Sequence, residues 1–199
     1  MGVRLARGGT AAPLEESGRV LGVDPGTVVT GWGIVETAGG TLVHLAHGTI
    51  TSSASESQGI RLSRIYRGLQ EILQRYEPDE MSLEKVFFAR DASSALKLGQ
   101  ARGVALLAAA EEGVAIHEYS SAEIKMAVVG YGQATKEQVQ KMIASLLHLP
   151  GRVPGDAADA LAAAICHFHQ RSFHDRVKES LPASGAGGAA RLAGPTNEE

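Results

Sequence analysis

Four carboxylates stand at places in the chain where strands end or a helix begins. Asp24 closes one short apolar run, and Glu84 lies near the end of another. Asp156 and Asp159 are three residues apart at the start of the last predicted helix, so their side chains share one helix face. Because strand ends beside a helix start are where open α/β folds place their sites, we expect these four side chains to converge.

Converging carboxylates are typical of a site for hard cations. Magnesium prefers oxygen ligands, and two such ions about 4 Å apart can activate a water and stabilise the departing 3′ oxygen of a phosphodiester. Acids brought together would repel one another without cations between them. Each acid taken alone is more often a turn or cap residue, and Asp156 equally suits a helix N-terminus, so spacing alone predicts only a candidate metal site. His167 and His169 are two residues apart on a predicted helix and do not face each other, which argues against a metal site formed by that pair.

The elements that must position the acids follow from hydrophobic periodicity and turn residues. Gly39 and Gly40 predict a hairpin turn, and Pro78 is expected to end the first helix. Ser120, with Glu123 three residues later, has the pattern of a capping box. Three strands followed by strands alternating with helices predict the α/β class, with a mixed sheet flanked by helices. The expected strands are residues 19–24, 30–36, 41–50, 81–86 and 114–119; the expected helices are residues 59–76, 92–111, one opening after Ser120, one from residue 135 stopped by Pro150, and 155–170.

Length and composition indicate one globular domain. The chain has 199 residues, of which 44% are hydrophobic and 21% charged, enough for a sizeable core. We expect a flexible N-terminal extension at residues 1–18, one domain at residues 19–172 and a disordered tail at residues 180–199 that is rich in Gly and Ala. No stretch of the sequence is long and apolar enough to span a bilayer. The single cysteine, Cys166, excludes an intrachain disulfide and favours a reducing cytoplasm, and its apolar surroundings predict a buried side chain.

The formal charge neither supports nor excludes a nucleic-acid partner. The net charge of −3 counts mildly against one. If four carboxylates serve as metal ligands, the rest of the chain carries about +1, which weakens that objection. An inference about DNA therefore has to come from the site.

Five segments around the acids form an ordered set of motifs. They are Gly22–Thr27 with Thr30–Gly33, Glu84–Ala89, Ser94–Gly103, Val128–Gly132 and Gly155–Ala162. Together they resemble the RuvC Holliday-junction resolvase family, and the resemblance covers roughly residues 19–170. The third segment is the longest and most specific match.

The resemblance implies an RNase H-like fold, a homodimer, and paired symmetric nicks in four-way junction DNA during recombination and repair. It implies Mg²⁺ as the cofactor, with Mn²⁺ as a substitute, and the branch-migration proteins RuvA and RuvB as partners. Asp24, Glu84, Asp156 and Asp159 match the family's four catalytic and metal-binding positions. Some members carry His at the third of these positions, where this chain has Asp156. The segment before residue 19 exceeds the family's usual start and touches none of these residues.

The same resemblance suggests which residues contact DNA. Phe87 is expected to stack on an unpaired base at the junction centre, and packing in the core explains it equally well. The candidates for phosphate contacts are Lys97, Arg102, Lys125 and Lys136. The resemblance favours Lys125 and Lys136 most, although for any single residue a solvated helix surface is an equal explanation.

Small residues on the long second helix suit a dimer seam. Leu96, Gly99, Gly103 and Leu106 have near-helical spacing, and small side chains let two helices approach closely. A dimer would supply the two active sites that two symmetric nicks require. Burial of this face against the chain's own sheet is the competing interpretation.

Three alternatives stay open at this point. The turn at Asp24 and Gly26, with Gly31 after it, also resembles the first phosphate loop of actin-like and sugar-kinase-like nucleotide-binding proteins, although those need two such domains. A catalytically silent junction-binding protein is the second, and the intact acid set argues against it. A nuclease of RNA–DNA hybrids is the third, and the segment Ser94–Gly103 favours the junction resolvase over it.

Overall fold

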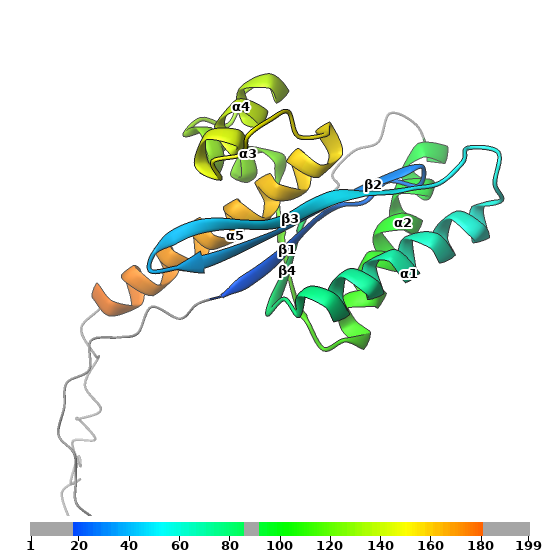
Figure 1. Ribbon diagram of the computed structural model, residues 1–199, viewed down its shortest axis with the longest axis horizontal. Coiled ribbons are helices and arrows are strands. Elements are labelled where there is room, and N and C mark those ends of the chain that lie inside the picture. The colour runs from blue at the N-terminus through cyan, green and yellow to red at the C-terminus, as the bar shows by residue number, and fades with distance from the viewer. Residues whose placement is uncertain (1–17, 86–91, 181–199) are drawn as a thin grey trace, which may run out of the picture.

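The computed structural model describes residues 18–85 and 92–180, with side chains to residue 173, as a single sheet with helices on both faces (Figure 1). No helix of the described part is long and apolar enough to cross a membrane. The strands are β1 Arg19–Asp24, β2 Val29–Ala38, β3 Thr41–Thr51, β4 Glu80–Glu84 and β5 Ala115–Tyr119. The helices are α1 Gln58–Tyr76, α2 Ala92–Glu111, α3 Ser121–Val129, α4 Lys136–Leu146 and α5 Gly155–Ser180.

The sheet is mixed, in the order β3-β2-β1-β4-β5. Strands β1, β2 and β3 pair antiparallel, whereas β4 lies parallel to β1 and β5 parallel to β4. Gly39 and Gly40 form the two-residue turn between β2 and β3 with φ of 57° and 76°, a left-handed backbone that favours glycine. The expected mixed α/β sheet and its hairpin are confirmed.

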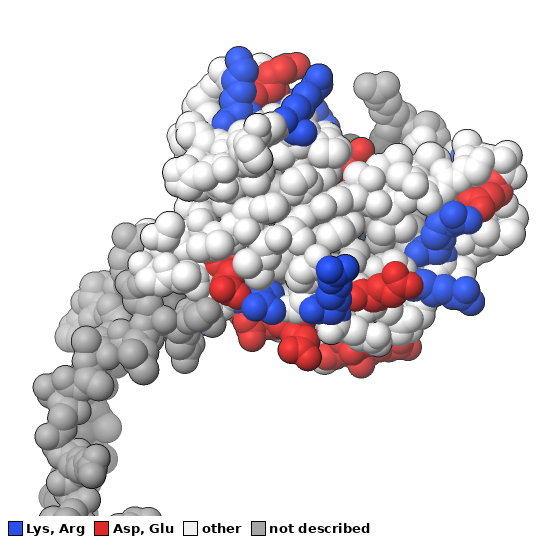
Figure 2. Space-filling view, viewed as in Figure 1, with Lys and Arg blue, Asp and Glu red and all other residues white. Residues whose placement is uncertain are grey.

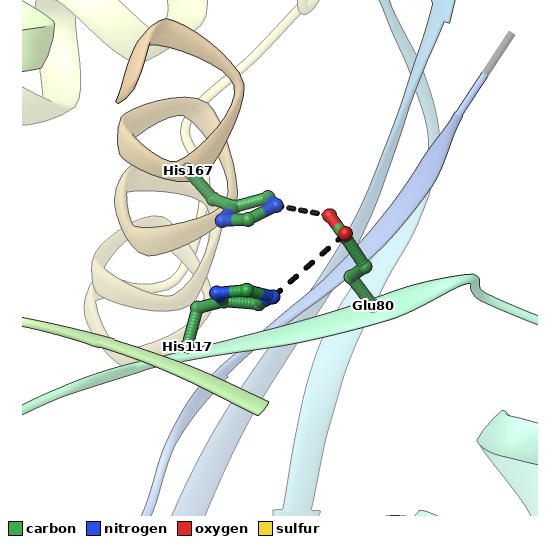
Figure 3. A group of neighbouring side chains, drawn as sticks. All are labelled: Glu80, His117 and His167. Atoms are coloured by element: carbon green, nitrogen blue, oxygen red, sulfur yellow. Dashed lines mark hydrogen bonds and ion pairs between the residues drawn. The ribbon is translucent and has the colours of Figure 1, made fainter. Parts of the chain in front are cut away.

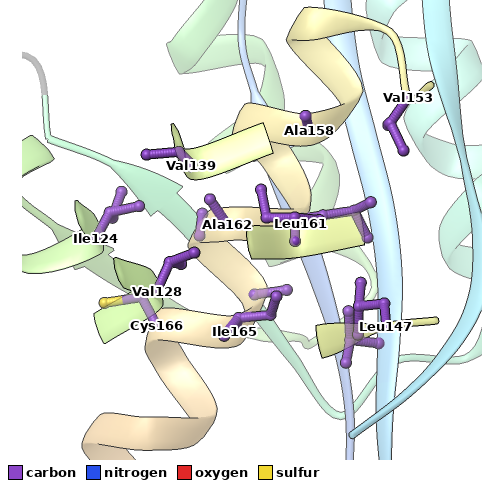
Figure 4. Packing of buried hydrophobic residues seen from close by; sticks show 14 of the residues in the cluster. Ile124, Val128, Val139, Leu147, Val153, Ala158, Leu161, Ala162, Ile165 and Cys166 are labelled. Atoms are coloured by element: carbon purple, nitrogen blue, oxygen red, sulfur yellow. The ribbon is translucent and has the colours of Figure 1, made fainter. Parts of the chain in front are cut away.

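The sheet divides two hydrophobic layers because side chains alternate along each strand. On β1, Val20 belongs to the layer beneath α3, α4 and α5, whereas Leu21 and Val23 belong to the layer beneath α1 and α2. Figure 4 shows the first layer, in which Leu161 and Ile165 of α5 lie among residues of α3 and α4. Helix α5 is therefore the central element of its layer, buried almost continuously from Ala157 to Phe168.

Several helix boundaries follow the expected signals. The capping box at Ser120 is present, and a second one at Thr135 opens α4. Cys166 is buried as expected, and burial raises the pKa of its thiol to about 12, which keeps it protonated. Helix α1 ends at Tyr76 before Pro78, with Glu77 in the left-handed conformation.

Two helix ends differ from the expectation. Helix α4 stops at Leu146, before Pro150, because Leu147 turns into the core and His148 adopts a left-handed backbone with φ 49°. Helix α5 continues to Ser180, well past the expected end near residue 170. The sequence after residue 170 has no glycine or proline before Pro182, so no local signal ends the helix where its apolar face ends. The domain boundary expected at residue 172 therefore falls inside α5.

Candidate active site

The end of β1 is a tight turn that presents Asp24. The Thr30 hydroxyl donates to the Gly26 carbonyl at 2.7 Å and accepts from the Gly26 amide at 3.2 Å. A side chain on Gly26 would meet the Val29 carbonyl oxygen at 2.2 Å, so the turn tolerates only glycine there. Asp24 itself pairs in register with Gly31 on β2. The motif residues around Asp24 therefore hold its carboxylate at the edge of the sheet.

The first turn of α5 rests directly on these two strands. A Cβ atom on Gly31 would lie 2.0 Å from the main-chain oxygen of Asp156, and one on Gly22 would lie 1.9 Å from that of Ala160. Two glycines on neighbouring strands thus let the helix backbone touch the sheet. This close approach brings the half-buried Asp156 and Asp159 beside Asp24.

Glu84 reaches the same edge from β4. Because β4 runs parallel to β1, with Leu83 opposite Val23, Asp24 and Glu84 end neighbouring strands at the same level. The Arg102 guanidinium donates to the Glu84 carbonyl oxygen at 2.6 Å and forms an ion pair with Glu118 of β5. These contacts tie α2 to the end of the strand that carries Glu84.

The four acids form one electrostatic unit, which we call the acid cluster (Asp24, Glu84, Asp156 and Asp159). The pKa of Asp24 is raised from 3.8 to about 7, first by burial and then by the negative charges of Asp159, Asp156 and Glu84. Lys136 partly offsets this, because its ammonium lowers the pKa of Asp24. The expected convergence of the acids is therefore present, and it leaves an excess of negative charge around Asp24.

The acid cluster fits hard divalent cations. Its donors are all carboxylate oxygens, the ligands that magnesium prefers, and its charge calls for a cation. Its oxygens do not form a group of three within 4.8 Å of one another, a spacing that among the described residues is reached only by Glu80, His117 and His167. Such looser spacing suits an ion that keeps several of its waters.

A pocket lined by two lysines includes two members of the acid cluster. It encloses about 260 Å³, and the Lys136 ammonium lies 2.8 Å from an Asp159 carboxylate oxygen at its rim. Figure 2 shows basic side chains over α3 and α4, the helices that carry Lys125 and Lys136. The pocket joins acids that suit a cation to lysines that suit a phosphate. It is lined by Glu84, Ser121, Ile124, Lys125, Lys136, Val139, Asp159 and Ala162.

The remaining predicted DNA contacts are placed differently. Lys97 lies on the exposed first part of α2, and Arg102 is largely buried by its contacts with Glu84 and Glu118. Phe87 falls outside the described residues. Thr30 and Glu118 were not expected as supports of the site. Thr30 stands inside the first of the sequence motifs, which could have pointed to it, whereas Glu118 is brought to Arg102 only by the fold.

The long helix α2 exposes part of the predicted dimer face. Leu96 is 64% exposed, and a Cβ atom on Gly99 or Gly103 would meet nothing within 4 Å. Leu106 packs against the core instead, and Leu107, 52% exposed, takes the solvent-facing place. Four alanines of the helix, and not its glycines, face the protein's own core: Ala101, Ala105, Ala108 and Ala109.

Comparisons with known proteins point in one direction. Residues 20–167 match the family described as crossover junction endodeoxyribonuclease RuvC. The protein of that name from Geobacter sulfurreducens is 51% identical over 149 residues, covering 75% of this chain and 91% of the relative. The one from Geobacter metallireducens is 52% identical over 160 residues, covering 80% and 98%.

Solved structures agree in fold. The structure of T. thermophilus RuvC in complex with a Holliday junction substrate matches with a TM-score of 0.73 and 34% identity, covering 81% of this chain and 96% of that one. The yeast mitochondrial Holliday junction resolvase Ydc2 matches with a TM-score of 0.60 and 13% identity, covering 85% and 87%, a likeness of fold alone.

Proposed function

The chain belongs to the RuvC family of crossover junction endodeoxyribonucleases, and we infer that it resolves Holliday junctions by cutting DNA at the acid cluster. Its mixed sheet with helices on both faces is the expected RNase H-like fold. Membership of this family replaces the nucleotide-binding alternative. The observation that carries the assignment of the site is geometric: the ends of β1 and β4 and the first turn of α5 bring four carboxylates to one edge of the sheet, and the raised pKa of Asp24 agrees with it.

The four carboxylates would hold Mg²⁺, with Mn²⁺ as a substitute. Bound there, two ions would supply activation of a water and stabilisation of the departing 3′ oxygen. Burial is the largest cause of the raised pKa of Asp24. Asp156 and Asp159 contribute from one helix face, and Glu84 from the neighbouring strand end. The fixed backbone around Gly31 keeps these oxygens in place, which is the protein's contribution to the chemistry.

DNA is held by the basic side chains around the pocket. Lys125 and Lys136 line it beside the acids, so a phosphate seated there would lie next to the cations. Lys97, exposed on the first part of α2, is a further proposed phosphate contact. Arg102 is a further phosphate candidate, although in the free protein its guanidinium is held by Glu84 and Glu118. Phe87, three residues after Glu84, is proposed to stack on an unpaired base.

The active form is proposed to be a homodimer joined through α2. The exposed Leu96 and Leu107, with Gly99 and Gly103 between them, form an apolar face with room for close helix contact. A twofold dimer places two equivalent sites on one junction, as two symmetric nicks require. RuvA and RuvB, which move the junction, are the proposed partner proteins, and the cytoplasm, where the DNA lies, is the proposed location.

The experiment is cleavage of a labelled synthetic four-way junction, beside a linear duplex and an RNA–DNA hybrid, with Mg²⁺ and with a chelator. We expect paired nicks that need Mg²⁺ and are confined to the junction. Cleavage of the hybrid in preference to the junction would overturn the substrate assignment and keep the metal site. Tight junction binding with no cleavage would support the silent binder instead.

A further inference from the structure

A second group of ligating side chains lies away from the acid cluster, at the start of β4 and in the middle of α5. Glu80 begins β4, whereas Glu84 ends it. His167 lies eight residues beyond Asp159 on α5, which corresponds to about 12 Å along a helix. His117, in the middle of β5, completes the group, which Figure 3 shows with both imidazoles turned toward Glu80. We call Glu80, His117 and His167 the His–Glu cluster.

These side chains meet on the face of the sheet that α5 covers. The Ser82 hydroxyl donates to the Ala163 carbonyl at 2.8 Å, so this face of β4 lies against α5. Ser82 is also the register partner of His117. Because alternate strand residues share a face, Glu80 and His117 both point toward the helix that carries His167.

The geometry of the His–Glu cluster is that of three ligands around one point. Its ligand atoms all lie within 4.8 Å of one another. Nε2 of His167 contacts Oε2 of Glu80, and Nε2 of His117 lies 3.7 Å from Oε1. The two rings are 4.3 Å apart between centroids and inclined at 37°. Each imidazole thus directs its Nε2 atom at a different oxygen of the Glu80 carboxylate.

One of these nitrogens is left without a partner. Nε2 of His117 is buried and has no hydrogen-bond partner among the described residues. Its distance of 3.7 Å to Glu80 is too long for a hydrogen bond. A buried polar atom without a partner costs free energy. An ion between the three side chains would take the lone pair of this nitrogen.

His167 has the supporting contact that metal-binding histidines usually have. Its side chain is 4% exposed, and its Nδ1 lies 2.8 Å from the Tyr119 hydroxyl oxygen. Without an ion, Nε2–H of His167 donates to Glu80 and Nδ1 accepts from Tyr119, whereas in the tautomer whose Nδ1–H donates to Tyr119 the Nε2 lone pair is available to an ion. A hydrogen bond of this kind fixes the ring orientation of metal-ligating histidines.

We propose that the His–Glu cluster is a structural site for Zn²⁺ or a similar borderline divalent ion. Two imidazole nitrogens and one carboxylate oxygen suit zinc, whereas magnesium prefers oxygen alone. A water would complete the tetrahedron, because the side chains of His117 and Glu80 are 39% and 22% exposed. The site is chemically distinct from the acid cluster and does not depend on the proposed nuclease reaction.

The competing state is a metal-free ion pair. Nη1 of Arg171 lies 3.8 Å from Oε2 of Glu80, so its positive charge disfavours a cation there. Without the ion, Oε2 of Glu80 pairs with both His167 and Arg171, and only Nε2 of His117 has no hydrogen-bond partner among the described residues. A bound ion would give a partner to the ligand atoms of all three side chains. The metal-free state gives one only to those of Glu80 and His167.

Bound zinc would lock α5 against β4 and β5. Strand β4 also carries Glu84, and α5 also carries Asp156 and Asp159. Strand β5 is the neighbour of β4 in the sheet. A clamp between the middle of α5 and the start of β4 would therefore help to hold in register the helix start and strand end that form the acid cluster. The measurable consequence is a zinc-dependent rise in thermal stability.

The test is a calorimetric titration of the full chain with Zn²⁺ in excess Mg²⁺, which occupies the acid cluster. We expect one zinc ion per chain, a rise in melting temperature, and affinity reduced by at least about tenfold in His117→Ala and Glu80→Gln. His169→Ala removes an exposed histidine of the same helix and is expected to keep zinc binding unchanged. His44→Ala controls for the histidine pair on β3, where Nε2 of His44 lies 2.8 Å from Nδ1 of His47.

Each outcome decides for or against the site. No saturable zinc binding by the wild-type chain, or binding that survives His117→Ala but is abolished in His44→Ala, would overturn the proposal. Should the cluster variants fail to fold, the visible absorption of bound Co²⁺ in the wild-type chain decides instead. Intense tetrahedral bands support the site, and a weak octahedral spectrum like that of an oxygen-only site contradicts it.

Discussion

A Cβ atom placed on Gly31 would lie 2.0 Å from the main-chain oxygen of Asp156. Gly31 is also the register partner of Asp24. The absence of a side chain on β2 is therefore what allows the first turn of α5 to bring two carboxylates beside a third. The geometry of the site depends on a residue that has no functional group.

Gly31→Ala should consequently damage both stability and cleavage. The new methyl has to displace helix backbone, and overpacking of this kind costs about 1–3 kcal/mol or more. Urea denaturation measures the decrease in stability, and junction cleavage should fall with it. Gly59→Ala is the matched control, because a Cβ atom there meets nothing within 4 Å. Equal stability of the two variants would show that α5 does not rest on β2 as described.

The raised pKa of Asp24 predicts how the metal-free protein responds to pH. The carboxyl titrates at about 7 in the folded chain against 3.8 as its ordinary value. The folded state therefore keeps a proton that the unfolded state releases, so this contribution to stability is full below about 4 and is lost as the pH rises through about 7.

Denaturation in chelator across this pH range checks the sign. Asp24→Asn has no carboxyl to titrate and should be the more stable protein at high pH, with the difference shrinking in acid. Adding Mg²⁺ should stabilise the wild type most at high pH, because the ion takes the place of the proton. A wild type that gains stability relative to Asp24→Asn as the pH rises would contradict the assignment.

Much of this arrangement could be predicted from local patterns, and some could not. The strand ends, the Gly39–Gly40 turn and the capping box at Ser120 depend on neighbouring residues, so the sequence indicates them directly. The convergence of the acids was predictable because strand ends and helix starts obey general rules of α/β sheets. The end of α5 was not, since nothing in the local sequence marks where its buried part stops.

Side-chain pairings away from strand ends and helix starts could not be predicted from the sequence. Helical spacing relates His167 only to residues of its own helix, such as His169. The fold brings it to Glu80 and His117, which come from two separate strands. Arg102 was expected to meet phosphate, and in the free protein it holds Glu84 and Glu118. Such pairings arise from strand order and helix packing, which no spacing along the chain encodes.

Arg102→Gln separates the two roles of that arginine. If Arg102 positions Glu84, the maximal cleavage rate should fall by an order of magnitude or more while junction affinity changes little. If it contacts a phosphate, affinity should fall and the dependence of binding on salt should weaken by about one charge. We expect the first result, and Lys97→Gln, on the exposed part of the same helix, is the control for the second.

Lys125→Ala and Lys136→Ala should weaken junction binding. Each variant removes one cation from the pocket beside the acid cluster. A DNA interface with one fewer neutralised phosphate should have a slope of log affinity against log salt that is shallower by about one. Lys136→Ala should in addition raise the pKa of Asp24, whose charge Lys136 offsets. Fluorescence anisotropy at several salt concentrations measures the slopes. Unchanged slopes in both variants would place the DNA elsewhere on the surface.

The most direct test of the acid cluster compares wild type and Asp24→Asn on one four-way junction, with binding and cleavage measured in the same preparation at saturating Mg²⁺. We predict that Asp24→Asn binds the junction as tightly as wild type and cuts it at least about a thousandfold more slowly, which corresponds to some 4 kcal/mol less transition-state stabilisation. Cleavage at near wild-type rate by Asp24→Asn would contradict the claim that the acid cluster is where the DNA is cut.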